Sequence, residues 1–153
     1  MAVTGTPRNY NKKFKFIVEI DGFASAKFQT CSELSAEAAV VEQWEGGSLL
    51  AEKQPGRITI PDLTLERGAT QDYDLWNWFK TVTNLVQNGG EVLPEYERSF
   101  DIVQHDRDNT TKLRWRCYRA WPNKFVAGDW DNTADENVIE AVTLVVHNFD
   151  LIV

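Results

Sequence analysis

The segment with the most suggestive spacing for chemistry is the acidic stretch at residues 129–140. Four of its acids, Asp129, Asp131, Asp135 and Glu140, stand at positions one, three, seven and twelve of a calcium-binding EF-hand loop. Position six, however, is Ala134, where the sharp turn of such a loop requires glycine. A strand pattern, not a helical one, runs through Glu140. We therefore predict a solvated acidic loop here and no metal site.

Side chains that commonly perform catalysis are present, but none stands in a catalytic spacing. His105 and His147 lack an HExxH or cysteine–histidine neighbour, no serine occupies a GxSxG elbow, and no glycine run matches a phosphate-binding loop. The 23 acidic residues make some close carboxylate pair inevitable in any fold, so such a pair is uninformative. Cys31 and Cys117 are far apart in the sequence, which indicates free buried thiols. We predict that the protein is not an enzyme and uses no cofactor.

Six tryptophans allow two interpretations. They are Trp44, Trp76, Trp78, Trp115, Trp121 and Trp130. A flat aromatic platform would suit a carbohydrate-binding β-sandwich module, whereas packing in a core or an interface is the more common use of tryptophan. Trp76 and Trp115 fit core positions, while Trp78 lies off the main helical stripe and is expected to face a neighbouring subunit.

The composition is that of an ordinary globular chain of 153 residues, with 42% hydrophobic and 25% charged residues. Its apolar runs are too short to cross a bilayer, and the N-terminus has no apolar stretch of signal-peptide length. The formal net charge of −7 disfavours a groove that grips phosphates, because nucleic-acid affinity comes mainly from lysine and arginine. We expect cytoplasmic synthesis, no signal peptide and no membrane segment.

Hydrophobic alternation predicts the elements that would position these residues. Residues 14–20 alternate strictly between apolar and polar, which is typical of a half-buried strand. A second extended segment at residues 35–44 ends at Gly46-Gly47. Residues 45–56 then form a long loop, and a loop of this length in a small domain is usually functional or mobile.

A third strand is predicted at residues 57–66, with a bulge or kink at Pro61-Asp62, because proline removes a donor from the ladder. The core face of this strand is expected to hold Ile58, Ile60, Leu63 and Leu65.

One helix follows, with Thr70 as its cap, acidic residues in its first turn and Asn88-Gly89-Gly90 at its end. Its packing face consists of Leu75, Trp76, Phe79, Val82, Thr83 and Val86.

Three more strands are predicted, at residues 98–104, 112–120 and 138–149, and the first two form a hairpin. The last strand is apolar on both faces, so its own domain or a neighbouring subunit must cover both. These elements predict a mainly β fold: an antiparallel β-sandwich or barrel with one packed α-helix.

Several segments, taken in order, resemble the phage tail-tube family, the inner tube subunits of contractile phage tails and contractile injection systems. They are FKFIVEIDGF, FQTCSEL, EGGSLLAEKQPG, ITIPDLTLERGAT, the helix around Trp76, LRWRCYRAWPNKF and NVIEAVTLVVHNFDL. Together they cover nearly the whole chain. The departures from the family pattern are the inserted Pro61-Asp62 and the cysteine at position 31.

The resemblance implies that residues 1–153 form a single tail-tube domain that assembles into stacked hexameric rings. Strands of each subunit would join a continuous barrel around a lumen that conducts DNA or protein cargo without binding it specifically. A sheath protein would lie outside the tube, with baseplate or hub and terminator proteins at its ends. The subunit would assemble in the cytoplasm and become part of a virion tail or injection particle.

Two sets of residues follow as candidate sites. The loop at 45–56 resembles the loop that reaches the adjacent ring, and its expected contact residues are Gly46, Gly47, Ser48, Leu49, Leu50, Lys53 and Pro55. The polar phase of the strands at 35–44 and 57–66 is expected to face the lumen, because only alternate residues of a strand point one way. That phase consists of Glu37, Arg57, Thr59, Thr64 and Glu66.

Overall fold

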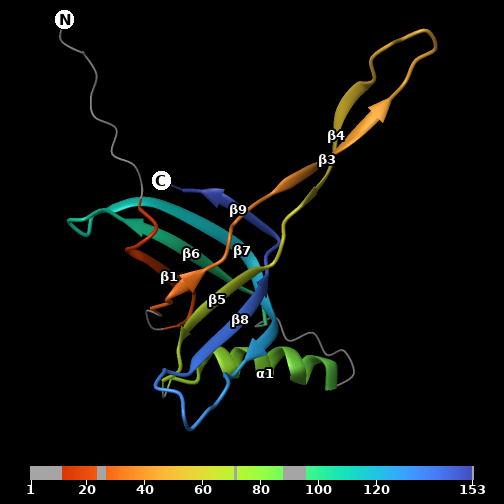
Figure 1. Ribbon diagram of the computed structural model, residues 1–153. Coiled ribbons are helices and arrows are strands. Elements are labelled where there is room, and N and C mark those ends of the chain that lie inside the picture. The colour runs from red at the N-terminus through yellow and green to blue at the C-terminus, as the bar shows by residue number, and fades with distance from the viewer. Residues whose placement is uncertain (1–11, 24–26, 71, 88–95, 153) are drawn as a thin grey trace, which may run out of the picture.

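The computed structural model describes residues 12–23, 27–70, 72–87 and 96–152 (Figure 1). In chain order its elements are β1 (Phe16–Ile20), β2 (Thr30–Cys31), β3 (Glu37–Gln43), β4 (Glu52–Thr59), β5 (Leu63–Gly68), α1 (Asp74–Gln87), β6 (Arg98–His105), β7 (Thr111–Val126), β8 (Ile139–Val145) and β9 (Asn148–Leu151).

Seven of the strands form one antiparallel sheet in the order β1-β6-β7-β8-β5-β2, with β9 paired to β7. Strand β7 is 16 residues long and pairs with β6 and β9 along its first part and with β8 along residues 121–126. The sheet therefore bends along β7, and β5 and β8 lie between the β1-β6 part and α1 in the view of Figure 1. The predicted fold, mainly antiparallel β with one packed helix, is confirmed.

The core lies between the two parts of the bent sheet and α1, which packs against β7. Strand β5 shows why these residues become strands: Leu63, Leu65 and Arg67 are buried, while Thr64 and Glu66 between them are half-buried. The same period of two places one side of each strand in the core. The buried core residues are Val18, Ile20, Phe28, Leu63, Leu65, Leu75, Trp78, Phe100, Cys117, Ala120, Val142, Leu144 and Val146.

Helix α1 begins later than predicted, at Asp74. Its first backbone amide is held by Asp72, whose Oδ1 accepts a hydrogen bond from the Asp74 amide at 3.2 Å, whereas Thr70 Oγ1 accepts one from the Asp72 amide. The capping prediction for Thr70 is therefore wrong by two residues, because an Asx turn precedes the helix. The predicted end of the helix at 88–90 lies outside the described residues.

In α1 the burial of the two tryptophans is the reverse of the prediction. Trp78 is 2% exposed, donates from Nε1 to the Tyr96 carbonyl at 2.7 Å and packs edge-on against Phe23. Trp76 is 44% exposed and stacks near Phe79 and Phe125. Trp78 can be buried because its indole N–H has a hydrogen-bond acceptor in the core.

The segment predicted as one strand at 138–149 is two strands, β8 and β9, separated at Val146 and His147. His147 donates its amide to the Tyr118 carbonyl, so the chain bends there from the β8 pairing to the β9 pairing along β7. Within β8 the alternate residues are buried and the rest are half-buried. The hairpin predicted at residues 98–120 is confirmed, although β7 continues to Val126.

The acidic stretch after β7 has no regular secondary structure up to Ile139, and its turn is closed by Asp131, which accepts from the amide and hydroxyl of Thr133. The described residues hold no group of three or more histidine, cysteine or acidic side chains that could bind a metal ion. Within the same ranges, no helix has the length and apolar character needed to span a membrane.

Candidate assembly surface

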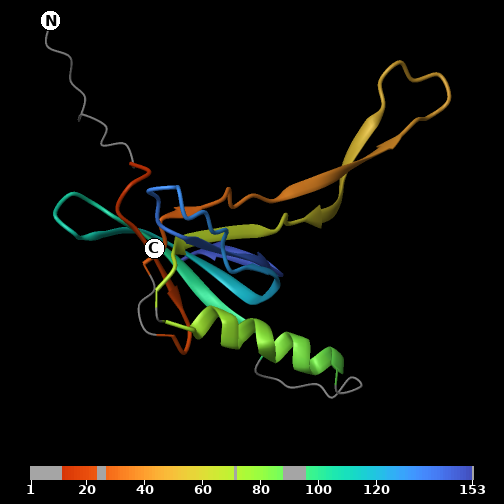
Figure 2. The ribbon, with the colours of Figure 1, turned by 60° about the horizontal axis from the view of Figure 1, so that its bottom comes forward.

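Strands β3 and β4 form an arm that extends away from the body of the molecule (Figures 1 and 2). They pair with each other as a separate two-stranded sheet, and every residue of β3 is exposed. The predicted loop at 45–56 is thus wrong in its second half, since β4 begins at Glu52 and completes a β-hairpin. The predicted break at Pro61-Asp62 is confirmed by the gap between β4 and β5.

Large apolar side chains on this arm lie in solvent. They are Val40, Val41, Trp44, Leu49, Leu50 and Ile58. Ile58 is 70% exposed, so its predicted position on the core face is wrong, whereas Leu63 and Leu65 are buried as predicted. Several large exposed apolar side chains on one projecting element indicate an interaction site.

The tip of the arm is an ordered turn that presents two leucines. Leu49 is 94% exposed and Leu50 is 82% exposed. Ser48 fixes the turn: its amide donates to the Glu45 carbonyl, and its Oγ donates to the Leu50 carbonyl at 2.7 Å. Gly47 has φ of 84°, a conformation that favours glycine. The tip residues are therefore held in place by local bonds.

The residues predicted to contact the adjacent ring all lie on this arm and are exposed. Gly46, Gly47, Ser48, Leu49 and Leu50 lie in the tip, and Lys53 and Pro55 lie on β4. Pro55 pairs with Val40 beside a register shift, where Gly56 and Arg57 of β4 stand opposite Ala39 of β3. Proline lacks the backbone donor of a regular ladder, and a bulge is one of the places where a strand tolerates it.

The residues predicted to face the lumen lie on two different sheets. Glu37 stands opposite Thr59 in the arm, with Arg57 two residues along on the same strand. Thr64 and Glu66 lie on β5, on the side away from the core. Their neighbours are polar: Thr64 Oγ1 is 3.4 Å from Thr143 Oγ1, and Glu66 accepts a hydrogen bond from Thr30.

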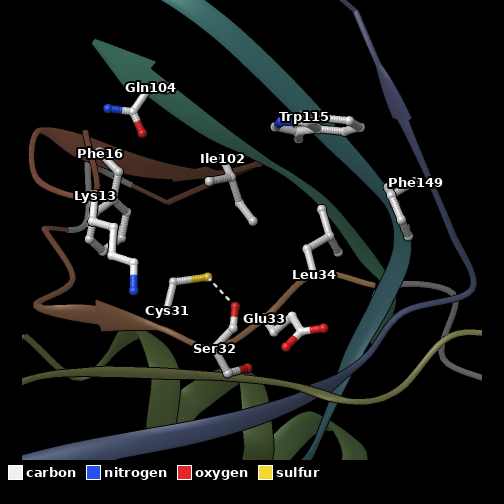
Figure 3. Close-up of a pocket in the computed structure, with 10 residues that line it drawn as sticks. All are labelled: Lys13, Phe16, Cys31, Ser32, Glu33, Leu34, Ile102, Gln104, Trp115 and Phe149. Atoms are coloured by element: carbon white, nitrogen blue, oxygen red, sulfur yellow. Dashed lines mark hydrogen bonds between the residues drawn. The ribbon is translucent and has the colours of Figure 1, made fainter. Parts of the chain in front are cut away.

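A groove of about 600 Å³ opens between the β1-β6-β7 part of the sheet and the segment after β2 (Figure 3). Its lining residues are Lys13, Phe16, Cys31, Ser32, Glu33, Leu34, Ile102, Gln104, Trp115 and Phe149. Trp115 and Phe149 meet edge to face, with ring centroids 5.9 Å apart. Cys31 donates its thiol to the Ser32 carbonyl, and burial raises its pKa to about 11. The sequence did not reveal this groove, because the 31–34 segment has no periodic pattern that would place it over β1 and β6.

On the opposite face of β1, β6 and β7, charged side chains form a closed ladder that the sequence also did not reveal. Asp101 is buried and accepts from Arg114 at 2.6 Å and from Arg116 at 2.9 Å. Glu19 accepts from the same Nη1 of Arg114, and Asp21 accepts from Nη2 of Arg116. The Asp101 and Glu19 carboxylates raise the pKa of Arg114. Since its charges are mutually paired, we assign this ladder to sheet stability.

The T4-like virus tail tube protein gp19 family model matches residues 12–150 of the chain. The chain belongs to this family. As a tail tube protein it is a structural protein, and this membership does not favour a carbohydrate-binding module. No curated protein matches the chain.

Several solved structures have a similar fold. A chain in the tube-terminating cap of the anti-feeding prophage has a TM-score of 0.80 and 20% identity, with 99% of this tail tube protein and 98% of that chain covered. A chain in the PVC sheath–tube complex, an extracellular contractile injection system, has a TM-score of 0.77 and 19% identity, over 93% and 90%. Hcp1 from Flavobacterium johnsoniae has a TM-score of 0.56 and 14% identity, over 90% and 94%.

Proposed function

We propose that this tail tube protein, acting as a single domain, assembles into hexameric rings that stack into the inner tube of a contractile phage tail or a phage-tail-like injection system. The observation that supports this most directly is the β3–β4 arm. It projects apolar side chains into solvent, and no described residue of the same copy covers them. A neighbouring copy would bury them, because burial of apolar surface is the main driving force of association.

Ring closure also accounts for the open edges of the sheet. Strands β1 and β2 end the main path of the sheet, and β9 pairs with β7 alone. Unpaired strand edges invite pairing with other chains, and a closed ring of subunits removes such edges. The arm would then join one ring to the next through the residues from Gly46 to Pro55.

The charge of the chain suits a conduit. Six copies at −7 each carry −42 formal charges per ring. A lumen with part of this charge would repel the DNA backbone or an acidic protein, so that cargo slides without adhering. The lumen face would include Glu37, Arg57, Thr59, Thr64 and Glu66. The similar structures include sheath–tube, baseplate and cap assemblies, which supports a sheath outside the tube and baseplate or terminator proteins at its ends.

Electron microscopy of the purified protein tests the proposal. We expect rings in negative stain and tubes at higher concentration. A sharper variant replaces residues 44–51 with Asn-Gly, a two-residue turn that keeps all pairs of the arm because Gln43 already pairs with Glu52. This variant should form rings but no tubes.

The matched control shortens the other hairpin, by placing Asn-Gly in place of residues 106–110 between the paired His105 and Thr111. It should still form tubes. A monodisperse monomer at every concentration would refute assembly, whereas normal tubes from the shortened arm would remove only the arm from the ring–ring contact.

The lumen assignment has its own test. Thr59→Cys in a Cys31→Ser background should react in assembled tubes with a small thiol reagent and exclude a bulky one. Free reaction with a reagent too large to enter the tube would place β4 on the outside.

A further inference from the structure

The groove and the tip of the arm match each other in chemistry. The groove walls are apolar, with Phe16, Ile102 and Trp115 on the strands and Leu34 across from them (Figure 3). All four are partly accessible to solvent. A volume of about 600 Å³ lies within the ~300–1,000 Å³ of cavities that hold ligands, and it is large enough for two side chains. In the described residues, no side chain fills this space.

The arm of the same copy cannot fill it. Leu34 lies three residues before the start of β3, so the groove is at the base of the arm. The seven residues of β3 alone extend the chain by ~24 Å at about 3.4 Å per residue, and the tip lies beyond them. The tip leucines and the groove are therefore at opposite ends of the arm, so a tip that reaches this groove must belong to a second copy.

The charges beside the two surfaces are also complementary. Lys13 and Glu33 line the groove, and neither forms an ion pair with another described residue. The tip leucines are flanked by Glu45, Glu52 and Lys53, all exposed. Lys13 can pair with a glutamate of the tip and Glu33 with Lys53, and two such pairs would orient the contact.

We propose that Leu49 and Leu50 of one copy insert into the groove beneath Trp115 and Leu34 of the next copy. This inference rests on the proposed function, since it names the acceptor for the arm that joins the rings. Because donor and acceptor are different surfaces, the contact is heterologous and repeats without closing along the direction of the arm. Such a contact propagates a stack from copy to copy.

Native Cys31 makes the contact directly testable, because its thiol lines the groove. Leu49→Cys places a second thiol at the tip. Oxidation with diamide joins the two sulfurs: each thiol loses a proton and an electron, and diamide becomes the hydrazine. We expect covalent dimers and longer ladders on non-reducing gels of tubes, and none after Cys31→Ser is added. Arg107→Cys, in the turn of the other hairpin, is the matched control and should not link to Cys31.

A second readout uses the unmodified groove. Leu49→Ala with Leu50→Ala should raise the concentration needed for tube formation by tenfold or more, since two buried leucines lose most of their apolar area. It should also leave Cys31 open to maleimide labelling, which wild-type tubes should block. The buried Cys117 should stay unlabelled in both.

The outcomes separate the two proposals. Suppose that tubes form, that maleimide still labels Cys31 in them, and that Leu49→Cys forms no disulfide with Cys31. This result would refute the groove as the acceptor of the tip, and the proposed function would stand. A link to Cys31 from Val3→Cys instead would overturn it in favour of the N-terminal segment as occupant. Absence of rings and tubes under all conditions would refute the proposed function and this contact with it.

Discussion

The buried ion pair between β5 and β8 offers the sharpest test of how this tail tube protein is stabilised. Arg67 and Glu140 stand opposite each other in the strand register and are 6% and 8% exposed. Arg67 Nε donates to Glu140 Oε1, and its Nη2 donates to the Asp72 carbonyl at 3.2 Å, just before α1. The guanidinium also lies over the Phe28 ring, 5.7 Å from its centroid. One side chain thus ties the sheet to the start of the helix.

Glu140→Ala leaves the buried Arg67 charge with only its longer ion pair, 3.8 Å to the Asp72 carboxylate, which is partly exposed. Removing one partner of a buried pair typically costs ~3–5 kcal/mol, against a total stability of about 5–15 kcal/mol. Replacing both partners with apolar residues of similar size is often neutral or stabilising, because no charge has to be taken out of water. We therefore expect Arg67→Met with Glu140→Leu to be clearly more stable than Glu140→Ala alone.

Urea denaturation followed by tryptophan fluorescence measures the effect. The measurement uses protein that light scattering shows to be monomeric, since association would add to the apparent stability. With a slope of about 1.5 kcal/mol per molar urea, a loss of ~3 kcal/mol lowers the midpoint by about 2 M. A midpoint shift below ~0.5 M for Glu140→Ala, or a double variant as unstable as the single one, would refute the reasoning.

Three further predictions follow from other described contacts. Trp78→Ala should cost ~3–5 kcal/mol because it empties a core position, whereas Trp76→Ala should cost clearly less; equal midpoints in urea would contradict this placement. The hydrogen bond from Arg119 lowers the pKa of Glu97 below 4.5, so the stability that this carboxylate contributes is complete above pH 4.5 and is lost as the pH falls through the folded pKa. The free energy of unfolding should therefore fall less steeply with acid in Glu97→Gln than in the wild type. Identical pH profiles would contradict this contribution. Gly128→Ala should destabilise by ~1–3 kcal/mol, since φ is 131° and an added β-carbon would lie 2.4 Å from a valine methyl; an unchanged melting temperature would show that this turn adapts.

The strands of the body were predictable because their packing partner lies in the same chain. Alternation at residues 14–20 matches β1, where Val18 and Ile20 are buried, and the break at Pro61-Asp62 separates β4 from β5. The division of 138–149 into β8 and β9 was not predictable, since both strands are apolar enough to read as one. Their separation depends on β7, which is long enough to pair with each in turn.

The helix shows a different limit. Periodicity identified α1 correctly, but it could not decide which indole faces inward, since Trp76 and Trp78 are both compatible with a broad apolar stripe. The decision depends on a hydrogen-bond partner at Tyr96 and a ring contact at Phe23, both distant in sequence. Helical periodicity gives the positions of side chains around the helix axis. It does not show which other segments of the chain contact them.

The arm explains why the prediction for Ile58 failed. Ile58 lies in a strand, as predicted, but that strand belongs to the arm and not to the core. An apolar position in a strand indicates that something covers it, but not which chain does so. In the single copy, Ile58 and the tip leucines are exposed while the groove at the base of the arm is unfilled by any described side chain. In the proposed contact, the exposed apolar side chains at the tip of the arm fill the apolar groove at the base of the next copy's arm. In a chain that builds a tube, part of the hydrophobic pattern therefore specifies the next copy, and such residues are found by comparing the predicted core with the exposed surface of one subunit.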